Sequence, residues 1–367
     1  MKKIIYFLLP KLIDPNLDKV SGGTISNLRM IEQISESHKV ICIPMLCKSI
    51  PQSLIENKSV LLELPIKSNC GRIQYIFERY SRYENRVLNI IKKNGPGVLV
   101  GTRATINAAH KLSSKLKEPL VIITRAFEDL EQAGLRAPSD KRTMFRRVEG
   151  MLNRDKIVSA YRAADLVVTN SEYMKQEHCR LFGTIAQWHV SYPLMDLPRG
   201  EPVVNPITPI GFVNKGARKG QELILALARR MPEKEFLIYG TPLNTDGLGI
   251  CNVKNVGYVS DRVAMFGSVD LFLVPSVWDE PYGRVAAEAI WCGRPVIVSE
   301  KGGLPEAAPN DLFWVSNGDV ERWKGKIDHF ADPSNRVLVR GAIHAAQERI
   351  AAQSDCIAEK LLNLRPA

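Results

Sequence analysis

Residues 273–298 read LVPSVWDEPYGRVAAEAIWCGRPVIV, and this stretch contains the repeating unit from which the fold is built. The apolar run at residues 271–274 predicts a buried strand, and residues 284–292 predict a helix that begins just after Gly283. The apolar run at residues 295–298 predicts a second strand. A strand, a helix and a strand in succession are typical of a parallel sheet, so this stretch indicates the α/β class.

The same alternation runs along most of the chain. Predicted strands cover residues 4–9, 40–45, 98–100, 120–124, 166–169, 210–213 and 235–239, and predicted helices cover residues 27–37, 73–93, 105–116, 155–164 and 220–230. A loop that ends at Ser21-Gly22-Gly23-Thr24 separates the first strand from the first helix. Such a succession predicts doubly wound, Rossmann-like sheets, in which ligands bind beyond the carboxyl ends of the strands.

The length of 367 residues predicts about two domains of this kind. Five prolines between Tyr192 and Pro209 predict an interdomain linker, because proline supplies no backbone donor to a helix or strand. We therefore predict a first Rossmann-like domain at residues 1–200 and a second at residues 201–345. Residues 346–367 are predicted to form a C-terminal helix, with packing back on the first domain as an option.

The composition is that of a soluble globular protein, and we expect this protein to be made and kept in the cytoplasm. The apolar run at residues 4–9 is short and ends at Pro10, so it predicts a strand rather than a signal peptide. No run approaches the roughly 18–20 apolar residues of a membrane span. The seven cysteines and six histidines are scattered, without a disulfide framework or a metal-ligand spacing. We therefore expect no metal.

The net charge of +11 lies in the first part of the chain. Residues 1–200 carry 31 Lys/Arg and 19 Asp/Glu, whereas residues 201–367 carry 19 and 20. Basic and apolar residues alternate over residues 72–93 and 136–154, as in helices that lie on anionic membranes. We hypothesise that this half docks on an anionic membrane at its inner face or on a phosphorylated glycan. The alternative is a solvated helix face, because charge alone names no partner. Nucleic acid is not expected as a partner.

Chemistry-bearing residues surround the predicted helix at residues 284–292. The N–H groups at its start form an anion site, and Gly283 lets a phosphate approach the backbone closely. Glu280 lies just before the helix, and Glu288 lies inside it near the same end. A carboxylate that accepts two hydroxyl hydrogen bonds is a common way to hold a ribose. The alternative is an ordinary strand–helix–strand unit with surface glutamates.

These residues resemble the donor-site signature of the family-four, retaining GT-B glycosyltransferases, within the group 1 glycosyltransferases. The matching positions are Pro275-Ser276, Glu280-Pro281-Tyr282-Gly283, Glu288-Ala289, Gly293-Arg294-Pro295-Val296, Gly302-Gly303 and Glu306. Weaker matches continue elsewhere, at Gly211 to Asn214, Lys219-Gly220, Ala164 to Glu172 and Ser21-Gly22-Gly23. The resemblance implies two doubly wound Rossmann-like domains facing across a cleft, the first binding the acceptor and the second a nucleotide-sugar.

Carried over to this chain, the resemblance implies two catalytic residues, Glu280 against the donor sugar and Lys219 against the diphosphate leaving group. It implies that Glu288 holds the ribose. The donor-binding set implied in this way is Gly22, Gly23, Asn214, Arg218, Lys219, Glu280, Tyr282, Gly283, Arg284 and Glu288. A fixed lysine and helix N–H groups stabilise the negative charge that grows on a diphosphate as the sugar leaves, so no metal is then needed.

Two positions depart from the family pattern. Many members carry an arginine where this chain has Val213 or Asn214, and Lys215 or Arg218 could substitute for it. Many members also carry a histidine after the strand predicted at residues 120–124, where this chain has none. Three polar residues of that segment are candidates to line the acceptor or sugar cleft instead: Arg125, Glu128 and Asp129.

The function predicted in this way is a retaining, metal-independent transfer of a sugar from a nucleotide diphosphate-sugar. The acceptor would be a glycan or lipid-linked molecule, as in bacterial cell-surface polysaccharide or lipopolysaccharide synthesis. Two alternatives on the same architecture stay open, a nucleotide-sugar epimerase and a nucleotide-sugar-binding protein without turnover. A phosphorylase is less well supported, because no context for a cofactor-bearing lysine is recognisable. The sugar, the base and the linkage leave no side-chain signature.

Overall fold

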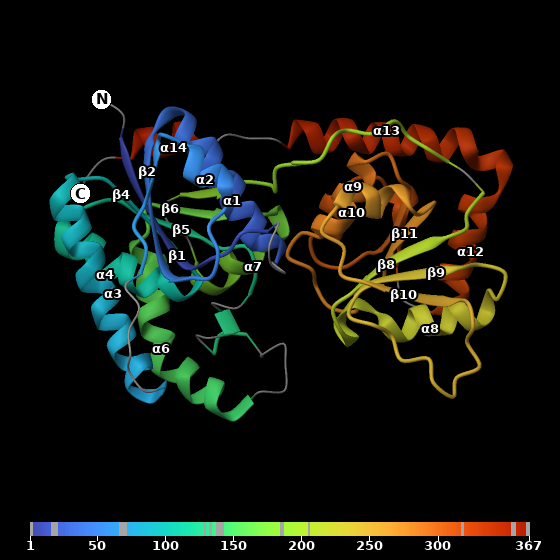
Figure 1. The fold of residues 1–367 in the computed structure, drawn as a ribbon, viewed down its shortest axis with the longest axis horizontal. Helices are drawn as coiled ribbons and strands as arrows, with labels where there is room; N and C mark the ends of the chain where they lie inside the picture. Colours follow the sequence, from blue (N-terminus) through green and yellow to red (C-terminus); the bar gives the residue numbers. More distant parts are fainter. Residues whose placement is uncertain are drawn as a thin grey trace. The chain divides into compact units, whose positions relative to one another are not determined.

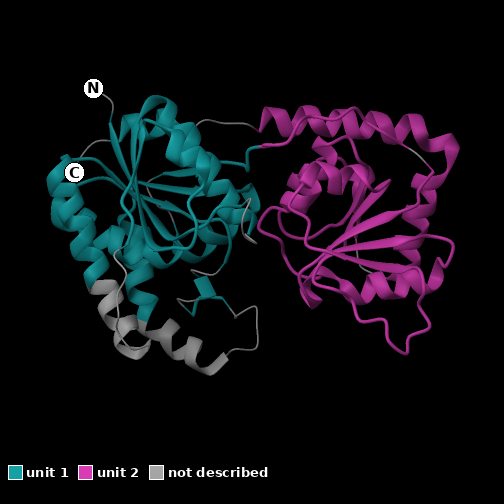
Figure 2. Ribbon diagram, in the orientation of Figure 1, with its two compact units in different colours: residues 1–194, 355–367 teal, residues 195–354 magenta. Residues whose placement is uncertain are grey.

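The computed structural model describes residues 3–15, 21–65, 72–127, 130–131, 134–136, 143–183, 187–204, 206–316, 319–353 and 357–364, with the backbone alone for residues 72–81 and 143–152. The chain forms two compact units (Figure 2). The first comprises Met1–Leu194 and Asp355–Ala367, and the second comprises Met195–Ser354. The division at Leu194 falls a few residues before the predicted one, inside the proline-rich stretch.

The first unit is built on one sheet of seven parallel strands (Figure 1). The strands are β1 (Ile4–Leu12), β2 (Lys39–Cys47), β3 (Val60–Leu62), β4 (Val98–Thr102), β5 (Leu120–Ile123), β6 (Leu166–Thr169) and β7 (Trp188–Val190). Their order is β3-β2-β1-β4-β5-β6-β7. The direction of winding therefore reverses between β1 and β4. In doubly wound sheets, this reversal point is where the loops diverge and a ligand can enter.

The helices of the first unit are α1 (Gly22–Ser37), α2 (Gln52–Glu56), α3 (Arg72–Asn94), α4 (Ile106–Leu116), α6 (Thr143–Ala163), α7 (Glu172–Phe182) and α14 (Ile357–Asn363), with the 3-10 turn η1 (Arg103–Thr105). Figure 1 shows α1, α2 and α14 on one face of the sheet and α3, α4 and α6 on the other. The residues Leu28 and Ile31 of α1 share one buried cluster with Ile357 and Leu361 of α14. The C-terminal segment is therefore part of the core of the first unit.

The first helix begins earlier than the sequence predicted. Ser21 is its N-cap, because the Ser21 Oγ accepts a hydrogen bond from the Thr24 N–H at 3.3 Å. Gly22 and Gly23 form the first turn of α1 rather than a separate loop. The prediction of a helix from residue 27 was wrong at this end, because two glycines read locally as a breaker while a serine cap can still start the helix.

The second unit repeats the design with six parallel strands. They are β8 (Ile210–Asn214), β9 (Phe236–Gly240), β10 (Val253–Gly257), β11 (Leu271–Val274), β12 (Val296–Ser299) and β13 (Trp314–Val315), in the order β10-β9-β8-β11-β12-β13. The winding again reverses between the first and fourth strands of the unit, here β8 and β11. The predicted doubly wound α/β architecture is confirmed in each unit.

The helices of the second unit are α8 (Gln221–Arg230), α9 (Arg262–Gly267), α10 (Arg284–Trp291), α11 (Leu304–Ala307), α12 (Val320–Ala331) and α13 (Arg336–Ala352), with the 3-10 turns η2 (Ala217–Lys219), η3 (Asp311–Phe313) and η4 (Pro333–Asn335). Figure 1 shows α8 on one face of the sheet, and α9 and α10 on the other with α13 against α10. Among the described helices, none has the length and apolar character needed to cross a membrane.

The predicted C-terminal segment, residues 346–367, is divided between the units. Its first part continues α13, whose Gln347 is buried and donates hydrogen bonds to the Gly200, Ile290 and Trp291 carbonyls at 2.8, 3.0 and 3.1 Å. These contacts hold residues 346–352 in the second unit. The sequence prediction of one helix overlooked the break after Ala352, because the residues before the break carry no proline or glycine.

Candidate active site

The reversal point of the second sheet carries the residues predicted to bind the donor. After β8 the chain passes through η2 and Gly220 into α8, and after β11 it passes through Pro275 and Glu280 into α10. The carboxyl ends of β8 and β11 are neighbours, since Phe212 is paired with Leu273. The structure therefore brings two loops that lie sixty residues apart in the sequence to one edge of the sheet.

Glu280 lies at the centre of these loops and is 5% exposed. Three donors converge on its Oε1 atom: the Lys219 ammonium, the Ser276 hydroxyl at 2.5 Å and the Trp278 indole N–H at 3.1 Å. Such convergence fixes the orientation of the carboxylate. Sequence reasoning predicted the Lys219 and Glu280 positions from the family pattern. It missed the contact between them and the support from Ser276 and Trp278.

The backbone of Glu280 is held by the glycine pair that follows β12. Gly303 donates its N–H to the Glu280 carbonyl at 2.7 Å, and Gly302 forms a parallel bridge with Glu280. Gly302 has φ +59°, and a Cβ there would lie 2.3 Å from the Glu280 oxygen. A side chain is thus excluded by the backbone of the Glu280 loop. The sequence motif Gly302-Gly303 reflects this packing.

Three cations gather after β8. The Arg218 guanidinium lies 5.1 Å and the Lys219 ammonium 5.9 Å from the centre of the Trp278 ring, within cation–π range. Lys215 as a whole is exposed to solvent, but its ammonium group is partly buried. This burial lowers the pKa of Lys215, and the like charge of Lys219 lowers it further. The carboxylates of Glu280 and Glu288 oppose this shift, so both act electrostatically on one ammonium.

Asn214 differs from these cations in its role. Its side chain is fully buried, donates to the Thr241 carbonyl at 2.8 Å and accepts from the Gly216 N–H at 2.9 Å. The structure therefore makes Asn214 a support for the loop after β8. Both ends of the amide are used by the backbone, and the membership of Asn214 in the donor-binding set stays a prediction.

The start of α10 is formed by backbone rather than by a side-chain cap. Gly283 is the N-cap residue with φ +108°, and a Cβ there would lie 2.4 Å from Leu304 Cδ2 in α11. Tyr282 is buried, and its hydroxyl donates to the Gln353 Oε1 at 3.1 Å. Gly283 and the Tyr282 side chain are therefore both packed against other elements of the second unit. Contact with a phosphate through the N–H groups of residues 282–284 stays a prediction.

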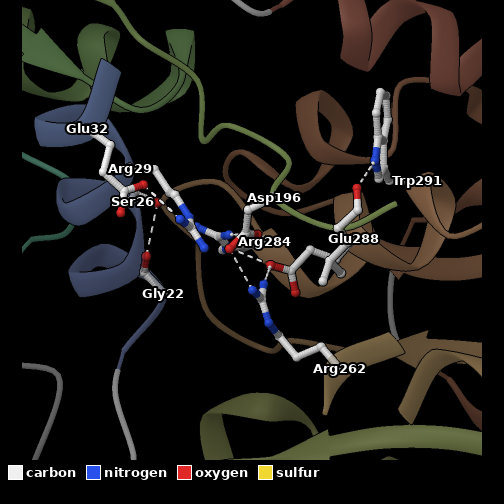
Figure 3. A network of polar contacts seen from close by, with 10 residues as sticks. Gly22, Ser26, Arg29, Glu32, Asp196, Arg262, Arg284, Glu288 and Trp291 are labelled. Carbon is white, nitrogen blue, oxygen red and sulfur yellow. Dashed lines mark hydrogen bonds and ion pairs between the residues drawn. The ribbon is translucent and has the colours of Figure 1, made fainter. Parts of the chain in front are cut away.

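Glu288 is buried and belongs to a network of four charged side chains, which Figure 3 draws together with neighbouring residues. Its Oε1 accepts from Arg284 Nε at 2.5 Å and from Arg262 Nη1 at 2.5 Å. Asp196 completes the ring, because its two oxygens accept from Arg262 and Arg284 at 2.7 Å each. Two carboxylates and two guanidiniums thus neutralise one another beside the first turns of α10.

The network contains two residues that sequence reasoning missed. Asp196 lies in the proline-rich stretch and Arg262 begins α9, so neither carries a motif. Burial alone pulls the pKa of Arg262 down, but the hydrogen bond to Asp196 and the charges of Glu288 and Asp196 outweigh it and raise the pKa. Arg262 thus stays a cation beside the residue predicted to hold the ribose.

The predicted residues of the first unit lie at the reversal point of its own sheet. Gly23 and Arg125 both line a pocket of about 150 Å³, and Gly22 directly precedes Gly23 in the first turn of α1. Arg125 is 9% exposed and its Nε donates to Asn27 Oδ1 at 2.7 Å. Glu128 and Asp129 lie outside the described residues. Within the described parts of the chain, no group of three or more His, Cys, Asp or Glu is placed to hold a metal ion.

The sequence of the second unit matches a known family. Residues 207–332 match the family described as "Glycosyl transferases group 1". The "D-inositol 3-phosphate glycosyltransferase" of Mycobacterium tuberculosis (strain ATCC 25618 / H37Rv) is 32% identical over 152 residues, covering 35% of this chain. The matched part spans 31% of that relative, and the protein of the same name from Mycobacterium bovis (strain BCG / Pasteur 1173P2) gives the same values.

Solved structures extend the similarity of the fold over the whole chain. Sucrose-phosphate synthase from Thermosynechococcus elongatus has a TM-score of 0.74 at 18% identity, covering 98% of this chain and 97% of that one. Anabaena Alr3699/HepE in complex with UDP and glucose has a TM-score of 0.71 at 18% identity, covering 99% and 100%. WaaG, a glycosyltransferase involved in lipopolysaccharide biosynthesis, has a TM-score of 0.67 at 16% identity, covering 97% and 98%. The chain therefore has the GT-B fold, and its residues 207–332 match the group 1 glycosyltransferase family.

Proposed function

We propose that this protein is a retaining, metal-independent glycosyltransferase that takes a sugar from a nucleotide diphosphate-sugar. The observation that carries the proposal is the Lys219–Glu280 pair, held by Ser276 and Trp278 at the reversal point of the second sheet. The group 1 match covers both residues of the pair. A structural neighbour was solved with UDP-glucose, which supports a nucleotide-sugar as the donor.

The proposed chemistry follows from where charge develops. When the bond between the sugar and the diphosphate breaks, negative charge grows on the leaving group. Lys219, with Arg218 and Lys215 beside it, can stabilise this charge, together with the start of α10. In this proposal Glu280, whose carboxylate is held by Lys219, Ser276 and Trp278, accepts hydrogen bonds from sugar hydroxyls, and Glu288 accepts them from the ribose. Binding would then draw Lys219 from Glu280 to the diphosphate, and would add hydroxyl donors to the network around Glu288.

A panel of nucleotide diphosphate-sugars, incubated with the full chain in the presence of a chelator, tests this function. We expect slow hydrolysis of one donor to the nucleoside diphosphate and a free sugar that is released first with the donor's own anomeric configuration, seen by proton NMR. Loss of activity in the chelator would contradict metal independence, and release of the opposite anomer would contradict retention. Inversion at C2 without hydrolysis would favour the epimerase, and tight binding without any product would favour a non-catalytic binding protein.

The proposed acceptor is a glycan or lipid-linked molecule of the bacterial cell surface. The lipopolysaccharide role printed for WaaG supports this class, and the inositol phosphate in the name of the curated relatives supports a phosphorylated acceptor. A panel of lipid-linked and phosphorylated glycans, incubated with the donor that the first assay selects, tests this class. Transfer only to acceptors that are neither glycans nor lipid-linked would contradict it.

We also propose peripheral attachment at the inner face of a membrane through the basic first unit. Two of the basic positions predicted for this role, Lys92 and Lys93, are exposed at the end of α3. Arg86 is only partly exposed, and its guanidinium donates to the Pro44 carbonyl at 2.5 Å. This partial burial lowers the pKa of Arg86. The side chains of residues 72–81 and 137–152 lie outside the description. Absence of sedimentation with anionic liposomes at low salt would contradict this attachment.

A further inference from the structure

The pocket of the first unit lies where its sheet reverses direction. Three successive strand ends contribute to its wall: Lys11 at the end of β1, Arg103 after β4 and Arg125 after β5. The remaining lining residues are Leu9, Pro10, Ser21, Gly23, Thr24, Asn27, Leu28, Thr102 and Ala126. The carboxyl ends of strands at a reversal point are the usual place for a ligand in such a sheet. The pocket is thus in the expected position for a binding site.

The charged residues of this pocket all have the same sign. Lys11 and Arg103 are exposed at its rim, while Arg125 is buried in its wall. Among the described residues that line the pocket, none is acidic. A concave surface whose described lining carries three cations and no carboxylate focuses a positive field and therefore favours an anion.

The geometry around Arg125 holds its guanidinium in place. Asn27 accepts a hydrogen bond from the Arg125 Nε at 2.7 Å, and Asn170 donates one to the Arg125 backbone carbonyl at 3.1 Å. The hydroxyls of Ser21, Thr24 and Thr102 line the same pocket and can donate to an oxyanion. The start of α1, a helix of 16 residues, lies at the pocket wall through Ser21 and Gly23, and its dipole has the sign that favours an anion.

We propose that this pocket binds a phosphate group carried by the acceptor. The proposal rests on the proposed function, because a transferase needs an acceptor as well as a donor. The same chemistry could come from the donor diphosphate, as the family resemblance implied for Gly22 and Gly23. The acceptor is favoured because the second unit already provides the donor diphosphate with its own cations, Lys215, Arg218 and Lys219. A volume of about 150 Å³ has room for several waters and hence for one phosphate.

Equilibrium dialysis of radiolabelled inorganic phosphate at low salt tests the pocket without any transfer reaction. The test variant is Lys11→Gln with Arg103→Gln, which changes two exposed rim residues and spares the buried Arg125. The matched control is Lys92→Gln with Lys93→Gln, which removes two exposed charges of the same unit. We expect the rim variant to weaken phosphate binding about tenfold or more, and the control to bind like the unchanged protein. Equal loss in both variants, or no phosphate binding by the unchanged protein, would overturn the proposal.

A second arm separates the two sources of phosphate. The affinity for UDP, and for the nucleoside diphosphate of any donor that is turned over, is measured for the rim variant and for Lys219→Ala. We expect the rim variant to keep this affinity and Lys219→Ala to lose it while it still binds phosphate in the first unit. If the rim variant loses both affinities together, the pocket holds the donor diphosphate and the acceptor assignment is overturned. If no donor is turned over, but the rim variant still binds phosphate more weakly than the control variant, the transferase proposal fails and the phosphate site stands.

Discussion

The two sheets of this protein wind in the same way and place their candidate sites at the same topological position, yet the charged side chains of the two sites are balanced differently. At the end of β8 and β11 in the second unit, every described carboxylate of the site is matched by a cation. In the pocket of the first unit, the part of the lining that the structure describes carries Lys11, Arg103 and Arg125 and no acidic residue. The fold selects where a ligand binds, and the side chains select which ligand.

The largest effect is expected from the Lys219–Glu280 pair. Lys219→Ala and Glu280→Gln should each lower the turnover of the donor by about 10²–10³-fold, the range found when one preorganised charge-stabilising group is removed. Stability should change much less, because the Lys219 side chain is 26% exposed and the Glu280 change keeps the shape. The measurement is donor turnover beside chemical denaturation. Full activity in both variants would contradict the assignment of the site to the second unit.

The network around Glu288 should carry more stability than any exposed ion pair. Asp196→Ala leaves the Arg284 guanidinium, 9% exposed, and the partly exposed Arg262 guanidinium with one carboxylate, so the free energy of unfolding should fall by about 3 kcal/mol. Glu321→Ala provides the control, because it breaks the exposed Arg230–Glu321 pair and should cost under about 1 kcal/mol. Urea unfolding of both variants compares them, and equal losses would show that the network adds nothing beyond an ordinary surface pair.

Two glycines of one loop offer a finer comparison. Gly220 has φ +85°, and a Cβ there would lie 2.0 Å from the Pro275 carbonyl oxygen; Gly216 has φ +100° with open space around it. Gly216→Ala should cost about 1–3 kcal/mol, the strain of its positive-φ, extended-ψ backbone alone. Gly220→Ala should cost more and should also lower donor affinity, because the loops after β8 and β11 must separate. Equal unfolding midpoints for the two variants would show that the clash is relieved without cost.

The smallest effect is expected at Cys292, which reports on the charge of Glu288. Burial, and then the Glu288 carboxylate, raise the pKa of the Cys292 thiol to about 11, while Arg262 and Arg294 oppose the shift. Glu288→Gln removes the negative charge, so the pKa should fall and alkylation of Cys292 at pH 9 should become faster. Mass spectrometry of the alkylated peptides measures this rate, with the exposed Cys251 as internal control. A rate at Cys292 that is unchanged relative to Cys251 would show that the two groups are not coupled.

Sequence reasoning located the strand–helix–strand unit of the second domain closely. The strand predicted at residues 271–274 is β11, and the helix predicted from Arg284 is α10. It did not find β10 (Val253–Gly257), whose residues VKNVG are largely exposed and carry no strand pattern. Strands of this kind are stabilised by the neighbour they pair with, here β9, rather than by their own composition.

The candidate site divides in the same way. Glu280, Gly283 and Glu288 could be predicted because they lie within nine residues of one another around a helix start, where spacing alone brings them together. Asp196, Arg262 and the rim residue Lys11 could not, because their partners come from other elements of the fold. Asn214, predicted within the donor-binding set, supports the loop after β8 with a buried side chain, and its contact with a donor stays a prediction.

The sequence alone determined the α/β class and the two-domain organisation, because apolar periodicity and helix starts are set by neighbouring residues. The donor motif was predicted from the resemblance of residues 275–306 to a family pattern. Tertiary structure decided which charges pair with which, that α14 joins the core of the first unit, and that three cations line one pocket there. These features depend on contacts between segments far apart in the chain, which form only when the strands take their order in the sheet.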